Sequence, residues 1–116
     1  MTEPCLVSDH FVNKDASVRA LYDRLLKVLH SIGTVTEDPK KTSIHINRKS
    51  ALIGVEARKD CLLVNIKSDH QIKSPRVEKM EQVSSKRFHH KVRISSLKDF
   101  DDELKGWLKE AYLLSE

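Results

Sequence analysis

The sequence is poor in the residues that break a chain or cross-link it. It contains three glycines, three prolines and two cysteines among 116 residues. So few glycines and prolines argue against a loop-rich or low-complexity chain. Neither Cys5 nor Cys61 has a second cysteine or a histidine at the spacing of a metal site. We therefore expect no metal site and no cofactor.

Long apolar runs are also missing. No segment approaches the roughly 20 apolar residues that a membrane span needs. The first nine residues lack the basic start and the apolar stretch of a signal peptide. The sequence thus predicts a cytoplasmic protein without a membrane partner. In that compartment we expect two reduced thiols rather than a Cys5–Cys61 disulfide.

Charge is abundant but unevenly distributed along the chain. The net charge is +4, and 33% of the residues are charged. Residues 40–93 carry fourteen basic and five acidic side chains, a net charge of +9, whereas both flanking segments are net acidic. If these basic groups share one face, their positive potential would attract an anionic partner.

Two segments show the three- and four-residue apolar spacing of amphipathic helices. The first runs from Asp15, which suits an N-cap, to Gly33, which suits a helix end. The second follows Ser96 and Asp99, which resemble a capping box, and extends to about Leu114. Before the first helix, residues 1–14 are expected to form an extended lead-in. Residues 15–116 are then expected to form a single domain.

Period-two alternation predicts four strands, at residues 42–47, 51–57, 61–67 and 88–94. Residues 34–41 are expected to form a connection. The segment after Ser74-Pro75 favours a short helix over 75–83, with an ordered loop as the alternative. The resulting prediction is an α+β fold with a four-stranded, mainly antiparallel sheet and two helices on one of its faces.

The uncovered face of this sheet is the candidate site. Alternation places on it side chains that could bind an anion or a partner: Lys41, Ser43, His45, Asn47, Lys67, His89, Lys91 and Arg93. Nucleic acid or another phosphate-bearing ligand fits such a basic surface. The absence of Phe, Tyr and Trp from it weakens the case for single-strand binding by base stacking. The alternative is that these polar residues only make an open sheet face soluble and bind no partner.

Apolar side chains on the same face suggest another partner. Leu52, Cys61 and Leu63 are expected among the polar residues there. They favour, as an alternative, a protein partner or a homodimer formed through this face.

Signatures of catalysis are weak or missing. The sequence contains no GxSxG elbow and no P-loop. His89 and His90 are neighbours on a predicted strand, so they point to opposite faces and cannot chelate one ion together. Glu56-Ala57-Arg58, after Asp38, only partly matches the pattern of a metal-dependent nuclease. We therefore favour a non-enzymatic binding module of unknown function, with an enzyme that uses His45 and Glu56 as the last-ranked alternative.

Several segments resemble one small bacterial family. They are Asp9–Phe11, Arg19–Leu26, Pro39–His45, Ser74–Arg76, Glu81–Ser84, Arg87–His90 and Trp107–Tyr112. The family is an uncharacterised domain of unknown function that is sometimes loosely labelled a predicted transport protein. The resemblance implies a bacterial, cytosolic α+β domain and brings no functional residues with it. The transport label gains no support from a sequence without a membrane segment.

Overall fold

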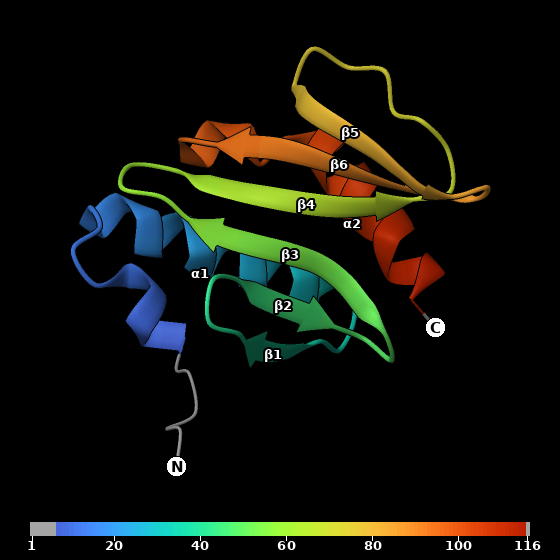
Figure 1. The fold of residues 1–116 in the computed structure, drawn as a ribbon. Coiled ribbons are helices and arrows are strands. Elements are labelled where there is room, and N and C mark those ends of the chain that lie inside the picture. The colour runs from blue at the N-terminus through green and yellow to red at the C-terminus, as the bar shows by residue number, and fades with distance from the viewer. Residues whose placement is uncertain (1–6, 116) are drawn as a thin grey trace.

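A six-stranded antiparallel sheet forms one layer and two helices form the other in the computed structural model, which describes residues 7–115 (Figure 1). The elements are η1 (Val7–Phe11), α1 (Ala16–Ile32), β1 (Thr36–Pro39), β2 (Ile44–Asn47), β3 (Ala51–Ala57), β4 (Leu62–Ser68), β5 (Val77–Ser84), β6 (Arg87–Ile94), η2 (Leu97–Asp99) and α2 (Asp102–Leu114). The strand order is β1-β2-β3-β4-β6-β5. Both helices lie behind the sheet in Figure 1, so its other face is open. Between residues 7 and 115, no helix is long and apolar enough to cross a membrane.

The predicted α+β class and the two helices are confirmed, but the prediction of four strands is wrong. The sheet has two further strands, β1 and β5, at its two edges. β1 lies in the segment that was expected to be a connection. It ends at Pro39, a residue that edge strands tolerate because no neighbour needs its missing N–H. The Tyr22 hydroxyl donates a 2.6 Å hydrogen bond to Glu37 and so ties β1 to α1.

β5 replaces the short helix or loop expected over residues 75–83. The spacing of Val77, Met80 and Val83 suggested a helix, but the strand contains two irregularities in its pairing with β6. Val77 pairs with Val92 and Met80 with His90, with a register shift between them. An extra residue at a bulge turns the two-residue repeat of a strand into a three-residue spacing. A bulged strand therefore imitates helical spacing in the sequence.

The core lies between the sheet and the two helices. Its fully buried strand residues alternate along the chain as predicted: Ile44, Ile46, Val55, Leu62, Val64, Ile66, Val92 and Ile94. The helices contribute Val18, Leu21, Leu25, Leu29, Leu104, Leu108 and Ala111. Burial of these side chains from water is the main force that holds the helices to this face.

Leu52 departs from the predicted alternation. It was expected on the open face, but it is 1% exposed and belongs to the hydrophobic core. The pairing of β2 with β3 shifts at this point: Ile46 pairs with Ile53, whereas Asn47 pairs with Ala51. Leu52 is thus the extra residue of a β-bulge, which allows two consecutive residues of β3 to be buried.

Helix ends follow the sequence signals. α1 begins after Asp15 and ends before Gly33. The capping box of Ser96 and Asp99 forms, although it precedes the short helix η2, and Asp101 then caps α2 by accepting from the Leu104 N–H at 3.0 Å.

Part of the expected extended lead-in is helical. Val7–Phe11 form the 3₁₀-helix η1, and residues 1–6 lie outside the described part of the chain. The Phe11 and Tyr22 rings lie 5.2 Å apart between their centroids. This aromatic contact packs η1 against the start of α1.

Arg76 fixes the connection between β4 and β5 to the start of α2. Its Nη1 lies 2.7 Å from Asp101 and 3.3 Å from Glu103, and its Nη2 donates to the Asp99 carbonyl at 2.7 Å. The guanidinium also lies over the Trp107 ring, 5.7 Å from its centroid. These contacts hold the β5–β6 hairpin close to the helix layer.

Two glycines allow a matched test of packing. A Cβ on Gly33 would overlap the Tyr112 ring, whereas a Cβ on Gly106 would meet nothing within 4 Å. We expect Gly33→Ala to lower the free energy of unfolding by about 1–3 kcal/mol, because the aromatic ring has to move. Gly106→Ala should raise it by about 0.5–1 kcal/mol, because alanine favours the helix. Urea unfolding of the two variants measures both effects, and a similar change in both would contradict this account.

Candidate functional site

A row of paired residues crosses the middle of the open face. His45 of β2 pairs with Gly54 of β3, which pairs with Asn65 of β4. Asn65 pairs in turn with Lys91 of β6, and Lys91 with Lys79 of β5. Directly paired residues of an antiparallel sheet point to the same face, so these side chains form one continuous line.

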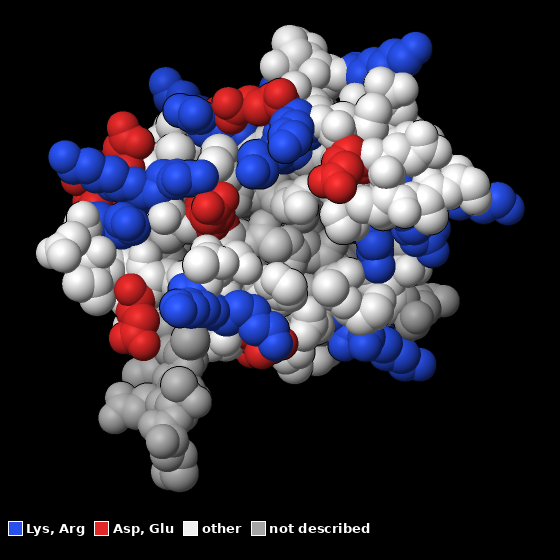
Figure 2. All heavy atoms as spheres, viewed as in Figure 1, with Lys and Arg blue, Asp and Glu red and all other residues white. Residues whose placement is uncertain are grey.

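Three adjoining hollows follow this row and meet at Asn65. Their volumes are about 110, 160 and 90 Å³. We call them together the central groove. Its lining includes His45, Gly54, Asn65, Lys67, His89 and Lys91, and also the two carboxylates of Glu56 and Glu81. Figure 2 shows this face hollowed in the middle, where uncharged atoms predominate, with basic and acidic side chains interspersed around the hollow.

Gly54 explains why the middle of the face is hollow. It is the position in the paired row without a side chain. A Cβ there would meet only the Cβ of Asn65, at the ordinary contact distance of 3.8 Å. The fold therefore does not require glycine at this position, and the open space above it is available to a ligand.

The lysines of the groove have no acidic partner. Among the described residues, no carboxylate lies within salt-bridge distance of Lys67, Lys79 or Lys91. The ammonium of Lys67 is 3.4 Å from the Ser50 hydroxyl. Burial, and then the positive charge of Arg87, lower the pKa of Lys67. A bound anion would offset both effects, because its negative charge favours the protonated ammonium.

Other basic residues of this face are already neutralised. Arg58 lies 3.1 Å from Glu56, and Arg93 lies 3.1 Å from Glu78. These two arginines are therefore less available to a ligand than the lysines of the groove, which have no such partner among the described residues.

The structure brings together five of the eight predicted site residues. Ser43, His45, Lys67, His89 and Lys91 all line the central groove. The other three do not line it. Lys41 is exposed in the turn between β1 and β2, Asn47 lies beyond the groove at the end of β2, and Arg93 is paired with Glu78.

Gly54, Asn65 and Lys79 are groove residues that the sequence prediction did not select. The strand phase does place Asn65 on the open face, but nothing in the sequence shows that it lies at the centre of a hollow. Lys79 was missed because its segment was predicted to be a helix or loop. Gly54 was missed because a glycine leaves a hollow only where side chains of the neighbouring strands surround it, and the sequence does not show which residues those are.

The apolar residues expected on the open face are covered. Leu63 is 9% exposed and Cys61 is 4% exposed. Burial raises the pKa of the Cys61 thiol, which is free. Cys5 lies outside the described residues. The structure thus removes the exposed apolar patch that suggested a protein partner or a homodimer.

His89 and His90 point to opposite faces, as expected from strand geometry. His89 lines the groove, whereas His90 is 0% exposed and lies in the core. The Nε2 atom of His90 accepts a 2.9 Å hydrogen bond from the Ile72 N–H, which fixes the proton on Nδ1. Within residues 7–115, no group of three or more His, Cys, Asp or Glu side chains could hold a metal ion.

A comparison with protein families gives a match over nearly the whole chain. The model of DUF5655, a domain of unknown function, matches residues 7–115. The chain belongs to the DUF5655 family. No curated protein and no solved structure matches it significantly. Membership in DUF5655 brings no activity with it, so the function has to be argued from the groove.

The buried His90 predicts a pH dependence of stability. Burial lowers its pKa in the folded protein, whereas the unfolded chain has a value of about 6.5. As the pH decreases, His90 therefore binds a proton in the unfolded state at a higher pH than in the folded state. The free energy of unfolding should fall below about pH 6.5 and level off once the pH is below the pKa of His90 in the folded protein. Urea midpoints measured between pH 7.5 and 5 should show this loss. This loss of stability should be smaller in His90→Gln and unchanged in His89→Gln. An equal pH slope in the wild type and both variants would refute the assignment of the loss to His90.

Proposed function

We propose that this DUF5655 domain is a non-enzymatic binding module that holds a phosphate-bearing ligand in the central groove. The observation that carries the proposal is the set of three lysines, Lys67, Lys79 and Lys91, that line the groove with no carboxylate of a described residue within salt-bridge distance, although Glu56 and Glu81 also line it. A partly buried ammonium without an acidic partner is unfavourable, so Lys67 and Lys91 favour a ligand that brings negative charge.

Phosphate suits this geometry better than a protein surface does. Lysine ammoniums act as compact point charges with three donors each, and they bind phosphate oxygens from several directions. Lys67 lies at one end of the groove and Lys91 nearer its middle, so they approach a ligand from two strands. The phosphate can belong to a small molecule or to a nucleic acid backbone.

A catalytic role is less well supported by the groove. The Glu56 carboxylate lies 3.1 Å from Arg58 and is engaged in that ion pair. His45 forms no hydrogen bond with another described residue that would orient it as a general base. Binding without chemistry is the simpler role for these residues.

The cytosolic, bacterial setting remains a part of this proposal. It is supported by the resemblance noted in the sequence and by the free, buried thiol of Cys61. The alternative of a protein partner or homodimer is less favoured, because Leu52, Cys61 and Leu63 are buried.

Charge removal at the groove tests the proposal. We expect Lys67→Gln and Lys91→Gln each to weaken binding of tripolyphosphate by roughly tenfold, since a hydrogen bond to a charged group contributes about 1.5–3 kcal/mol. Lys109→Gln, on the exposed side of α2, is the matched control and should bind like the wild type. NMR titration of the full chain measures the affinities and shows which amides shift. Binding should also weaken between low and moderate salt.

Two results would contradict the proposal. One is that tripolyphosphate at low salt causes no NMR chemical-shift changes at the amides of the groove. The other is an equal loss of affinity in the Lys109→Gln control.

A further inference from the structure

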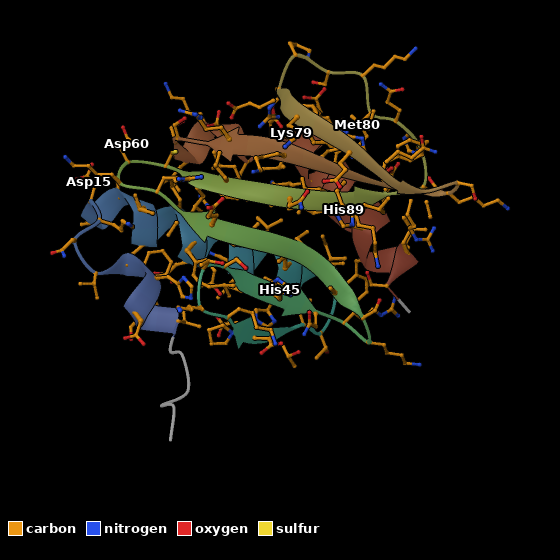
Figure 3. All side chains as sticks on the ribbon, viewed as in Figure 1. Asp15, His45, Asp60, Lys79, Met80 and His89 are labelled. Atoms are coloured by element: carbon orange, nitrogen blue, oxygen red, sulfur yellow. The ribbon has the colours of Figure 1, made fainter. Side chains whose placement is uncertain are left out.

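The central groove contains features that a phosphate group alone would not use. His45 and His89 line the same hollow of about 110 Å³, together with Gly54, Asn65 and Lys67. Figure 3 shows both histidines on the viewer's side of the sheet. They come from β2 and β6, which flank the pair of β3 and β4. The hollow therefore has an imidazole near each side.

The distance between these strands leaves room for a flat ring. β2 and β6 are separated by three strand spacings, or about 14 Å. Gly54 contributes no side chain to the space between them. Both imidazoles are partly buried, and neither is hydrogen-bonded to another described residue. Histidine rings are among the side chains on which unstacked nucleobases pack.

Asn65 gives this space a hydrogen-bonding group at its centre. It lines all three hollows of the groove and is only partly buried. No described residue forms a hydrogen bond with its side chain. A carboxamide offers a donor and an acceptor side by side, which complements the paired donor and acceptor on the edge of a nucleobase.

We propose that the central groove binds a nucleotide, with the base between His45 and His89 above Gly54. Asn65 hydrogen-bonds the edge of the base, and Lys67 or Lys91 binds the phosphate. This inference rests on the proposed function, because it assigns the phosphate to the same lysines. The nucleotide is free or part of a single strand; a base inside a duplex is stacked and cannot enter the hollow.

The first experiment compares ligands on the full chain by NMR titration. The probes are adenosine and uridine monophosphates, the two nucleosides, tripolyphosphate, and short single- and double-stranded oligonucleotides. We expect a nucleotide, free or in a single strand, to bind at least tenfold more tightly than either the nucleosides or tripolyphosphate, with shifts at His45, Gly54 and His89. The monophosphates and the single strand distinguish the two sources of the nucleotide.

The second experiment fills the hollow without removing charge. Gly54→Val places a side chain on the floor of the groove, in a strand position that valine favours. We expect it to weaken nucleotide binding at least tenfold and to leave tripolyphosphate binding within about twofold of the wild type. His45→Ala and His89→Ala should act in the same direction, His89→Phe should retain binding, and His30→Ala on the exposed side of α1 should have no effect. Thermal melts confirm that each variant is folded.

The outcomes separate the two proposals. The nucleotide assignment would be overturned, while phosphate binding stands, by either of two results. One is that nucleotides bind no more tightly than tripolyphosphate. The other is that a folded Gly54→Val variant keeps the wild-type affinity for nucleotides. Failure of every phosphate-bearing probe to shift the groove would overturn both. Equal affinity for nucleosides and nucleotides would refute the role of the lysines.

Discussion

Burial of only one face of the sheet is the constraint on which the rest of the structure depends. α1 and α2 cover that face with apolar side chains such as Leu25 and Leu108, both 0% exposed. Because successive strand residues point in opposite directions, each isoleucine or valine buried there sends its neighbours to the other face. The polar composition of the open face thus follows from the packing of the helices, and so does the alignment of His45, Asn65 and Lys91 across it.

β-Bulges modify this alternation where it matters for the groove. The bulge in β3 buries Leu52 and leaves Ala51 exposed at the end of the hollow. The irregularities in β5 bring Val77 and Met80 into line with buried partners and place Lys79 beside Lys91. Each bulge adds one unpaired residue to a strand, and the side chains beyond it change face relative to strict alternation. The composition of the groove depends on these local insertions as much as on the regular parts of the strands.

The electrostatic character of the open face is more local than the charge of the middle segment suggests. That segment carries a net charge of +9. In the folded chain, Arg58, Arg93 and Lys40 each lie about 3 Å from a carboxylate. Their positive charges are therefore partly compensated, and they attract a negatively charged ligand only weakly. Lys67 and Lys91 have no such partner within residues 7–115, and both line the groove that contains Gly54. The proposed nucleotide combines negative charge for these lysines with a flat base for the hollow.

The sequence by itself determined the elements whose signal is local. The helices ending at Ile32 and Leu114 and the central strands follow from apolar periodicity and capping residues. The opposite directions of His89 and His90 follow from strand alternation. Only the tertiary structure decided the edge strands, the position of Leu52 and the convergence of Asn65 with His45 and His89. The physical reason is that edge pairing, bulges and hollows depend on the register between strands far apart in the chain. The sequence neighbours of a residue do not reveal which residue lies opposite it on the adjacent strand, or whether that residue is a glycine.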